Sequence, residues 1–509
     1  MYVAEQKTMQ LLDHFTIEQL GLPGAVLMEN AGSAVVQAIL KDYPKNTRVL
    51  VLSGYGNNGG DGFVIARRLI DFGYDVLLCF IGNEAKLKGD ARIHYQVYKN
   101  RQLPFYHFNA GENDIFTYIQ QADVIIDAML GTGVSGEVRF PFNRIIEAVN
   151  ESNKDVISVD IPSGLNSDTG KAASTTIKAK KTITFAMPKI GFFVGDGPTV
   201  IGEWEVADIS VPDSIVETLQ LKLPKLLDEA TAISSLPQRM KHGHKGAFGH
   251  CLVIGGCKHY VGAPVYTAKA AFHSGIGLVT LAIPETIYPL VAGTCHESLF
   301  MPLSDSNGFI NWKAIETIDF SKYTTIAFGP GLGRELDGDA IIRTLLNQLT
   351  TQTLIIDADG LYFLKNHLEQ LQHYKGDIIL TPHPGEMATL TGKSVAEIEA
   401  NRLETAKNFA ATYGAYLLLK GHRPIIATPT SELWINPYGN DALGKGGSGD
   451  VLTGLIASLV SQHQNPLKAM LCASFYHAIA AEELGRNSSN YGVTPMDIIH
   501  YIPILFGRK

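Results

Sequence analysis

A chain of 509 residues is too long for one ordinary domain, and its 45% hydrophobic and 18% charged residues are typical of a globular enzyme with two or three domains. A formal net charge of −8 without a long basic run argues against a nucleic-acid partner. The five cysteines are scattered and form no Cys-x-x-Cys pair, which favours a reducing compartment. Without an apolar signal region or a run of about 18 apolar residues, we expect a cytoplasmic enzyme with no membrane partner.

The first half of the chain alternates apolar strands with helices. A strand over residues 48–53 is followed by a glycine-rich segment and a helix over residues 63–72, which is the opening of a parallel α/β unit. Further strands are predicted at 75–80, 124–126, 156–159 and 181–185, with a helix at 142–150. We therefore expect an N-terminal three-layer α/β/α sandwich of the Rossmann-like kind, over residues 1–218.

The second half of the chain also alternates apolar strands with helices. Three prolines among mixed polar residues, Pro212, Pro224 and Pro237, indicate a domain boundary near residues 215–225. Beyond it, a strand at 250–254, two glycines and a helix near 265–274 open a second α/β unit. Its later strands are predicted at 278–283, 325–328, 353–356, 377–380, 416–419 and 425–427. We expect a second three-layer α/β/α sandwich over residues 225–509.

Acids and amides follow the N-terminal strands. The segment Asn57-Asn-Gly-Gly-Asp-Gly62 is too polar for a standard dinucleotide fingerprint, and Asp127 and Asp160 stand where two other strands end. Ligands bind at the carboxyl ends of parallel strands. Oxygens of Asn58, Asp127 and Ser163 would suit one hard cation; the alternative is that each caps a turn or helix by itself.

Residues 1 to about 215 resemble NAD(P)H-hydrate epimerase. The resemblance rests on four motifs in fixed order: Gly54-Tyr-Gly-Asn-Asn-Gly-Gly-Asp-Gly62, Asp127-Ala-Met-Leu-Gly-Thr-Gly133, Asp160-Ile-Pro-Ser-Gly164 and Thr184-Phe-Ala-Met-Pro-Lys-Ile-Gly191. It implies that Asn58, Asp127 and Ser163 hold K⁺. It also implies a set of contacts to the hydrated nicotinamide nucleotide: Asn57, Asn58, Gly59, Gly60, Asp61, Gly131, Thr132, Gly133, Val134, Ser135, Gly136, Glu137 and Asp160.

Epimerisation requires an acid or a base near the hydrated ring. The ring nitrogen can help expel the hydroxyl from the neighbouring carbon, so that its configuration is lost and then regained from the other face. Asp160 is our first candidate for the acid–base group. Lys189 would either steady a phosphate or be a solvated surface lysine.

A second glycine-rich segment precedes an apolar helix predicted over residues 451–460. Gly446, Gly447 and Gly449 would let backbone N–H groups approach an anion, and the helix would point its positive dipole end at the same place. Asp450 stands at this junction, where a base would take the proton of a hydroxyl that accepts a phosphoryl group. The alternative is that Asp450 is only the N-cap of the helix.

Residues from about 225 to 509 resemble ADP-dependent NAD(P)H-hydrate dehydratase, a relative of the ribokinase-like kinases. The motifs are His244-Lys-Gly-Ala-Phe-Gly249, Gly255-Gly256, Gly262-Ala263, Gly329-Pro-Gly-Leu-Gly333, Asp357-Ala-Asp-Gly360, Thr381-Pro-His-Pro-Gly-Glu386, Lys420-Gly421 and Gly447-Ser-Gly-Asp450. The resemblance implies phosphorylation of the ring hydroxyl, with Asp450 taking its proton, and then elimination of phosphate; Mg²⁺ is expected with the phosphates. It implies substrate contacts from Ala263, Gly331, Gly333, His383 and Asp450. It implies ADP or AMP contacts from Lys420, Gly421, His422, Arg423, Pro424 and Gly449.

One loop departs from the family pattern. Members often read Gly-Asn-Pro-Gly-Met-Ala before the glycine turn, whereas this chain reads Gly439-Asn-Asp-Ala-Leu-Gly444 and then Lys445. Lys445 would either add a phosphate contact or be a solvated loop charge. His383 lies between two prolines, and it would either contact the substrate or be an ordinary turn histidine.

The sequence therefore predicts a bifunctional enzyme that epimerises and dehydrates hydrated NADH and NADPH, and that is a homo-oligomer. The enzyme alternative is a ribokinase-like small-molecule kinase. In the non-enzyme alternative for the first half, that half is a binding module without catalysis.

Overall fold

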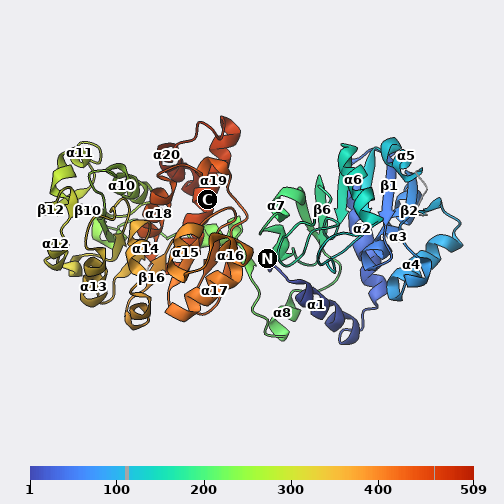
Figure 1. The fold of residues 1–509 in the computed structure, drawn as a ribbon, viewed down its shortest axis with the longest axis horizontal. Coiled ribbons are helices and arrows are strands. Elements are labelled where there is room, and N and C mark those ends of the chain that lie inside the picture. Colours follow the sequence, from blue (N-terminus) through green and yellow to red (C-terminus); the bar gives the residue numbers. More distant parts are fainter. Residues whose placement is uncertain (109–113, 464, 509) are drawn as a thin grey trace. The chain divides into compact units, whose positions relative to one another are not determined.

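The computed structural model describes residues 1–108, 114–463 and 465–508. The chain divides into two compact units, an N-terminal unit of residues 2–223 and a C-terminal unit of residue 1 with residues 224–509. Each unit is built on its own sheet with helices on its faces (Figure 1). No described helix is long and apolar enough to span a bilayer.

The N-terminal unit has one seven-stranded parallel sheet, in the order β3-β2-β1-β4-β5-β6-β7. Its strands are β1 (Arg48–Ser53), β2 (Asp75–Phe80), β3 (Phe105–His107), β4 (Val124–Ala128), β5 (Asp155–Val159), β6 (Lys181–Phe185) and β7 (Glu203–Ala207). Its helices are α1 (Gln6–Glu18), α2 (Gly24–Asp42), α3 (Asn57–Asp71), α4 (Gly89–Asn100), α5 (Asp114–Gln121), α6 (Phe142–Glu151), α7 (Gly197–Val200) and α8 (Ser214–Thr218). Strand order reverses between β1 and β4, the position at which open α/β sheets bind ligands.

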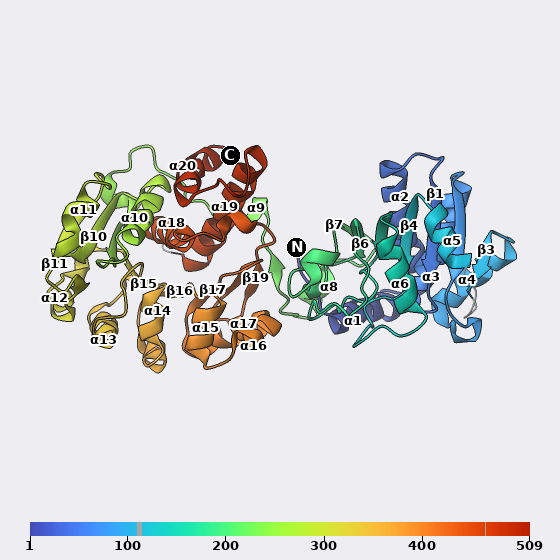
Figure 2. The ribbon, with the colours of Figure 1, turned by 45° about the horizontal axis from the view of Figure 1, so that its top comes forward.

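The alternating side chains of β1 enter two separate cores. Val49 and Val51 pack with α1, α2, α3 and α4, whereas Leu50 and Leu52 pack with α5 and α6 on the opposite face. A strand that is buried on both faces in this way belongs to the middle layer of three. The predicted three-layer α/β/α sandwich is confirmed, and its layers can be followed in Figure 2.

The C-terminal unit has a ten-stranded sheet in the order β11-β10-β9-β14-β15-β16-β17-β18-β19-β8. The strands from β11 to β17 are parallel, whereas β18 is antiparallel to both of its neighbours. The strands are β8 (Lys225–Leu226), β9 (His250–Ile254), β10 (Leu278–Pro284), β11 (Leu299–Leu303), β14 (Thr325–Phe328), β15 (Thr353–Ile356), β16 (Ile378–Leu380), β17 (Tyr416–Leu419), β18 (Ile425–Ala427) and β19 (Leu433–Ile435). A separate hairpin pairs β12 (Asp305–Ser306) with β13 (Phe309–Ile310).

Helices cover both faces of this sheet as well. Cys251 and Val253 of β9 face a core that includes α9 (Glu229–Ser234), α10 (Gly262–His273), α11 (Tyr288–Ala292), α18 (Ser448–His463), α19 (Pro466–Asn487) and α20 (Pro495–Phe506). Leu252 and Ile254 face a core that includes α12 (Trp312–Glu316), α13 (Gly338–Gln348), α14 (Asp359–Leu364), α15 (Pro384–Thr391), α16 (Val395–Ala400) and α17 (Arg402–Tyr413). The second three-layer sandwich is therefore confirmed.

Two predicted helix starts are wrong, because both helices begin inside their glycine-rich segments. Helix α3 begins at Asn57 rather than at residue 63, and α18 begins at Ser448 rather than at residue 451. Glycine is a poor helix former, so local propensity predicted loops. Packing overrides it in α3, since a Cβ on Gly59 would lie 1.9 Å from the carbonyl oxygen of Gly54.

Candidate active sites

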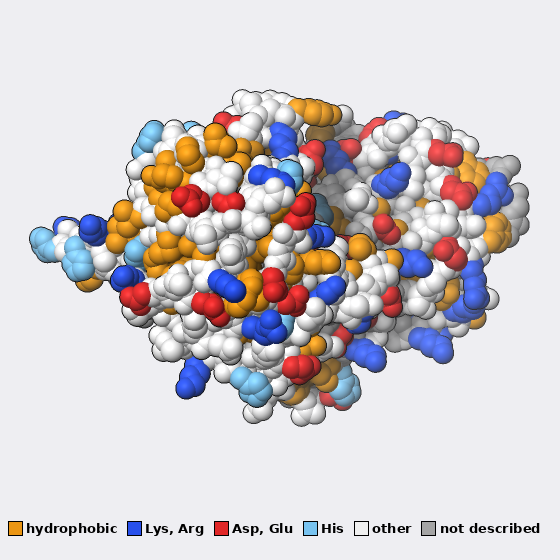
Figure 3. All heavy atoms as spheres, turned by 60° about the vertical axis from the view of Figure 1, so that its left-hand side comes forward, with side chains coloured by type: hydrophobic (Ala, Val, Ile, Leu, Met, Phe, Trp, Pro, Cys, Tyr) orange, Lys and Arg blue, Asp and Glu red, His pale blue; other side chains and the backbone are white. Residues whose placement is uncertain are grey.

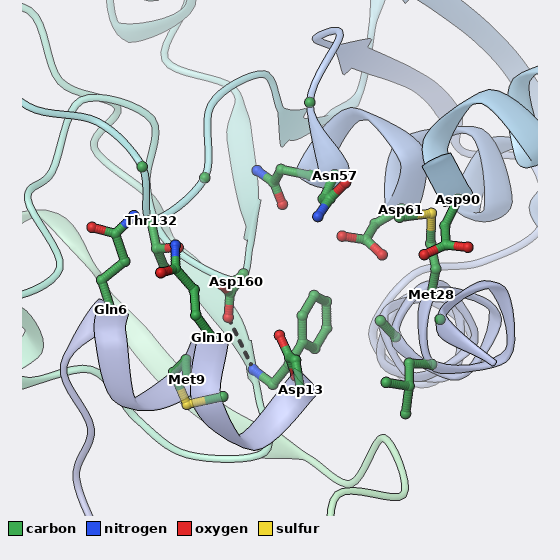
Figure 4. Close-up of a pocket in the computed structure, with 18 of the residues that line it drawn as sticks. Gln6, Met9, Gln10, Asp13, Met28, Asn57, Asp61, Asp90, Thr132 and Asp160 are labelled. Carbon is green, nitrogen blue, oxygen red and sulfur yellow. Dashed lines mark hydrogen bonds between the residues drawn. The ribbon is translucent and has the colours of Figure 1, made fainter. Parts of the chain in front are cut away.

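A cavity of about 520 Å³ lies at the carboxyl ends of β1 and β4. Its walls come from α1, from the starts of α2 and α3, from residues 129–134 after β4, and from residues near the ends of β5 and β6 (Figure 4). Strand ends and the first turn of α3 thus meet at the point where strand order reverses, as the sequence predicted for a ligand site.

Eight of the predicted substrate contacts line this cavity: Asn57, Asn58, Asp61, Gly131, Thr132, Gly133, Val134 and Asp160. The others do not line it. Gly59 and Gly60 pack against protein atoms, since Cβ atoms there would lie 1.9 Å from the Gly54 carbonyl oxygen and 2.5 Å from Met28 Sδ. Ser135 and Gly136, which follow Val134 in the chain, also lie outside the lining. Glu137 accepts hydrogen bonds from the backbone and side chain of Ser174.

The three residues predicted to hold a cation come together beside the cavity. Ser163 Oγ donates to Asp127 Oδ1 at 2.5 Å, and the backbone N–H of Ser163 donates to Oδ2 at 2.8 Å. Asn58 Nδ2 donates to the Leu130 carbonyl at 3.0 Å, while Asn58 Oδ1 is buried and has no hydrogen-bond partner among the described residues. A buried oxygen that lacks a donor next to a buried carboxylate fits a hard cation.

Asp160 forms an ion pair with Lys189, which corrects both interpretations of that lysine. Lys189 is 1% exposed, and its ammonium donates to Asp160 Oδ1 at 2.5 Å and to Thr184 Oγ1 at 2.9 Å. It also donates to two backbone carbonyls, at 3.2 Å each. It is therefore neither solvated nor free to bind a phosphate. The sequence did not reveal this because the two residues belong to the ends of neighbouring strands, β5 and β6.

Further carboxyl groups line the same cavity, and burial raises the pKa of two of them. Asp13 of α1 and Asp61 of α3 both line it, with the Lys189–Asp160 pair nearby (Figure 4). Burial raises the pKa of Asp13 to about 6, with Lys189 opposing the rise and Asp160 adding to it. Burial also raises the pKa of Asp61 well above its usual value, and the Asp160 and Asp13 carboxylates add to that rise. Asp13 was missed, although the spacing of Gln6, Gln10 and Asp13 along one helical face could have indicated it.

In the C-terminal unit, charged groups gather at the carboxyl ends of β15 and β17 and the start of α18. Lys420 Nζ donates to Asp357 Oδ1 at 2.7 Å, and Thr453 Oγ1 donates to Asp357 Oδ2 at 2.6 Å. Although burial opposes its charge, the Lys420 ammonium holds the pKa of Asp357 below its usual value. A Cβ on Gly449 would lie 3.5 Å from Lys420 Nζ, so the ammonium lies directly beside the glycine turn.

Asp450 lies in the first turn of α18. It is not the N-cap that the alternative interpretation required, because the helix begins two residues earlier at Ser448. Burial raises the pKa of Asp450 to about 7, with the Asp357 carboxylate adding to the rise and Lys420 opposing it. A carboxylate that titrates near neutrality beside a helix N-terminus suits a base next to a bound anion.

The other predicted substrate contacts of this unit lie where β14 and β16 end and, for Ala263, at the start of α10. Gly331 and Gly333 have φ of +64° and +78°, and a Cβ on Gly331 would lie 2.8 Å from the Cβ of Ala263. His383 is the N-cap of α15, because its Nδ1 accepts the backbone N–H groups of Gly385 and Glu386 at 3.0 and 3.3 Å. Capping the helix is a structural role that accounts for a histidine at this turn even without a ligand. The other ring nitrogen of His383, Nε2, lies 3.4 Å from Glu386 Oε1.

The predicted nucleotide segment, residues 420–424, is the turn between β17 and β18. Gly421 has φ of +126° and packs against the guanidinium of Arg402, which donates to the carbonyls of Leu419 and Lys420. Burial lowers the pKa of both His422 and Arg423. Arg402 therefore fixes the shape of this turn, a role that no motif indicated.

Lys445, in the loop that departs from the family pattern, is partly exposed and also ties this loop to another part of the unit. Its ammonium donates to the carbonyls of Asn490, Tyr491 and Val493, in the segment before α20. Neither interpretation of Lys445 included this role, because its partners lie nearly fifty residues away along the chain; its contact with a phosphate stays a prediction.

Neither site depends on a basic surface. On the face shown in Figure 3, Lys and Arg side chains are scattered among Asp and Glu rather than gathered into one patch. Among the residues described in either unit, no group of three or more His, Cys, Asp or Glu could hold a metal ion. Anions would therefore be bound by backbone N–H groups and single cations such as Lys420.

Comparison with known proteins gives matches to both units. A family model described as NAD(P)H-hydrate dehydratase matches residues 251–504, and one described as YjeF-related protein N-terminus matches residues 24–191. A curated relative from Moorella thermoacetica, named bifunctional NAD(P)H-hydrate repair enzyme Nnr, is 35% identical over 99% of this chain and 96% of its own length. A relative of the same name from Escherichia coli K12 is 32% identical over 94% of this chain and 89% of its own length.

The chain belongs to the family of bifunctional NAD(P)H-hydrate repair enzymes. Membership confirms the resemblance that the sequence motifs indicated, and it covers both units. Among solved structures, an ADP/ATP-dependent NAD(P)H-hydrate dehydratase from Bacillus subtilis, co-crystallised with ATP and Mg²⁺, is 29% identical. The match covers 56% of this chain and 98% of the Bacillus subtilis chain, with a TM-score of 0.49.

Proposed function

We propose that this chain repairs hydrated NADH and NADPH in two steps. Residues 1–218 interconvert the R and S hydrates, and residues 225–509 dehydrate the S form at the expense of ADP, giving NAD(P)H, AMP and phosphate. The observation that carries the proposal is a family match that spans 99% of the chain, and therefore both units. The charged groups at the strand ends of each unit support it.

In the N-terminal unit, the hydrated nicotinamide would bind in the cavity between α1 and the start of α3. Asn57, Asn58, Asp61, residues 131–134 and Asp160 are the proposed contacts, whereas residues 135–137 lie outside the cavity, and Gly59 and Gly60 allow α3 to approach β1 closely. The Asp160 carboxylate is paired with the Lys189 ammonium at 2.5 Å. It would stabilise the positive charge that develops on the ring when the nitrogen expels the hydroxyl.

K⁺ is the proposed cation for Asn58, Asp127 and Ser163. The orphaned Asn58 Oδ1 and the buried Asp127 carboxylate support this assignment. When bound, the ion would supply a fixed positive charge for the nucleotide phosphate. Of the chain's own residues, Ser163 fixes the loop after β4, because the N–H of Leu130 donates to its Oγ at 2.9 Å.

In the C-terminal unit, Asp450 is the proposed base that takes the ring hydroxyl proton during phosphoryl transfer. Its position in the first turn of α18 supports that role, since Gly449 and the helix start would stabilise charge on the transferred group. Ala263, Gly331, Gly333 and His383 are the proposed contacts to the hydrate. Lys420, Gly421, His422, Arg423, Pro424 and Gly449 are the proposed contacts to ADP or AMP.

Mg²⁺ is proposed to accompany the phosphates of ADP. It usually takes one or two carboxylates with phosphate oxygens and water rather than an all-protein site. Asp357 lies close enough to the glycine turn to fit that donor set, since its Oδ2 would be 4.0 Å from a Cβ on Gly449. The homo-oligomer and the cytoplasmic location stay predictions.

The test is recovery of reduced-nicotinamide absorbance from a mixture of both epimers, with ADP or ATP, Mg²⁺ and K⁺. Complete recovery supports both activities and identifies the phosphoryl donor. Recovery that stops at the fraction of one epimer would remove the epimerase. No recovery with either nucleotide would contradict the proposal and favour a ribokinase-like small-molecule kinase. Omission of K⁺ should slow the recovery of the second epimer only.

A further inference from the structure

One wall of the N-terminal cavity is a helix to which the sequence motifs assigned no role. Helix α1 contributes Gln6, Met9, Gln10, Asp13 and Ile17 to the cavity lining. Their spacing of one, three or four residues places them on one face of the helix. Asp13 is the acidic member of this group, it interacts with the charges of Lys189 and Asp160, and Figure 4 shows it with Asp160 in the lining of the cavity. A carboxyl group thus faces the substrate cavity from outside the recognised motifs.

The charges around the cavity require a proton to be held there. The carboxyl groups of Asp13 and Asp160 interact with one buried ammonium, that of Lys189, and the Asp61 carboxyl interacts with both of these carboxyl groups. Asp90 of α4 adds a fourth acid to the lining. Like charges in a partly dehydrated cavity disfavour full ionisation, so at least one of these groups retains its proton near neutrality.

Hydrogen bonds determine which group can exchange that proton. Asp160 Oδ1 already accepts from Lys189 Nζ, Thr184 Oγ1 and the Phe185 N–H, so this oxygen is occupied. Asp61 is 7% exposed at the start of α3, where burial raises its pKa well above its usual value. The carboxyl of Asp13 has no hydrogen-bond partner among the described residues. Its pKa of about 6, raised by burial, lets it both donate and accept near neutral pH.

We propose that Asp13 is the general acid–base group of the epimerisation. Its protonated carboxyl gives a proton to the departing ring hydroxyl as the C–O bond breaks and the ring-nitrogen lone pair forms a C=N bond. Water leaves, and the cation lies beside the Asp160 carboxylate. A water then adds to the opposite face of the ring, and the Asp13 carboxylate takes its proton, directly or through a bridging water. One water leaves and one adds, so the step is balanced without an oxidant or a reductant.

The proposal rests on the epimerase function proposed for this unit, and the test is made on the full chain. Separated R and S hydrates are incubated with the protein in the absence of nucleotide, so that only their interconversion proceeds. Asp13→Asn should reduce the protein-catalysed rate by about 10²–10⁴-fold, the usual contribution of a general acid or base. The matched control is Glu18→Gln, an exposed acid on the same helix, which should leave the rate unchanged. Asp13→Glu should restore part of the rate.

Two further measurements separate catalysis from folding. The Asp13→Asn protein should dehydrate the S hydrate with ADP at the wild-type rate, because that reaction belongs to the other unit. The wild-type epimerisation rate should fall as pH rises through about 6, because the departing hydroxyl needs the protonated acid. A merely structural aspartate would not give this pH profile.

The outcomes distinguish the two proposals. A wild-type protein that does not accelerate interconversion contradicts the epimerase function, and the role of Asp13 with it. If the wild-type protein accelerates interconversion and the Asp13→Asn variant does so at an equal rate, only the role of Asp13 is overturned. If Asp13→Asn does not fold, a wild-type rate that stays constant from about pH 5 to pH 8 overturns that role instead.

Discussion

At the scale of single residues, the two sites use carboxylates next to lysines in opposite ways. Asp160 is locked to the buried Lys189, which favours its anion. Asp450 has no such partner, and burial raises its pKa to about 7, with Asp357 adding to the rise and Lys420 opposing it. The first arrangement suits a fixed charge, and the second suits a group that exchanges a proton during turnover.

Asp450→Asn should therefore reduce dehydration by about 10²–10⁴-fold while ADP binding persists, because the amide cannot accept the hydroxyl proton. Turnover of the S hydrate and ADP binding by calorimetry check this. The wild-type rate should rise with pH through about 7, since the base acts in its ionised form. Glu369→Gln, at an exposed position of the same unit, is the control. Wild-type turnover in the Asp450 variant would remove it from the role of base.

Lys189→Met should destabilise the N-terminal unit by about 3–5 kcal/mol, because it leaves the Asp160 carboxylate without its buried partner. Denaturant unfolding of the full chain, with a probe on this unit, measures the change. Lys178→Met, on the exposed surface of the same unit, should change stability by less than about 0.5 kcal/mol. Equal stability of the two variants would show that the ion pair contributes no net free energy.

At the scale of elements, both sites are built where a helix begins inside a glycine-rich segment. The glycines of α3 are needed for close packing, as the 1.9 Å approach at Gly59 shows. The glycines before α18 include Gly446, where a Cβ would meet no atom within 4 Å. Packing therefore does not explain Gly446, and we propose that room for an anion is the reason for glycine here.

Gly59→Ala should destabilise the N-terminal unit by about 1–3 kcal/mol or more, because the new methyl group overlaps the backbone of Gly54. Gly56→Ala is the matched control: it lies in the same turn, has φ of −89°, and a Cβ there meets nothing within 4 Å. Thermal unfolding of the two variants tests the difference. If both variants melt alike, close packing is not the reason for glycine at residue 59.

At the scale of the whole molecule, the chain contains two units, each with its own sheet and a core on both faces of it. Expressed separately, residues 1–223 and 224–509 should each unfold in one cooperative transition, because a domain with its own core folds independently. Calorimetry or circular dichroism on the two pieces measures this. A piece that shows no transition would contradict independent folding.

Local sequence patterns were enough to predict the two sandwiches, most of their strands, the family and the motifs at the strand ends. These patterns are apolar strands of three to seven residues, glycine turns and an acid after a strand. The predictions from sequence are wrong where tertiary contacts override the local helix preference of the residues. The helices α3 and α18 begin early because packing and a turn of special geometry favour glycine, against its poor helix propensity.

Which side chains meet follows from the three-dimensional fold and not from any local pattern. Nothing in the sequence pairs Asp160 with Lys189, Lys420 with Asp357, or Lys445 with the carbonyls near residue 490, because these partners lie 29, 63 and more than 40 residues apart. The sheet brings strand ends together irrespective of sequence distance, and burial then fixes the charge of each group. Asp13 reaches the cavity in the same way, from a helix that precedes every motif of the chain.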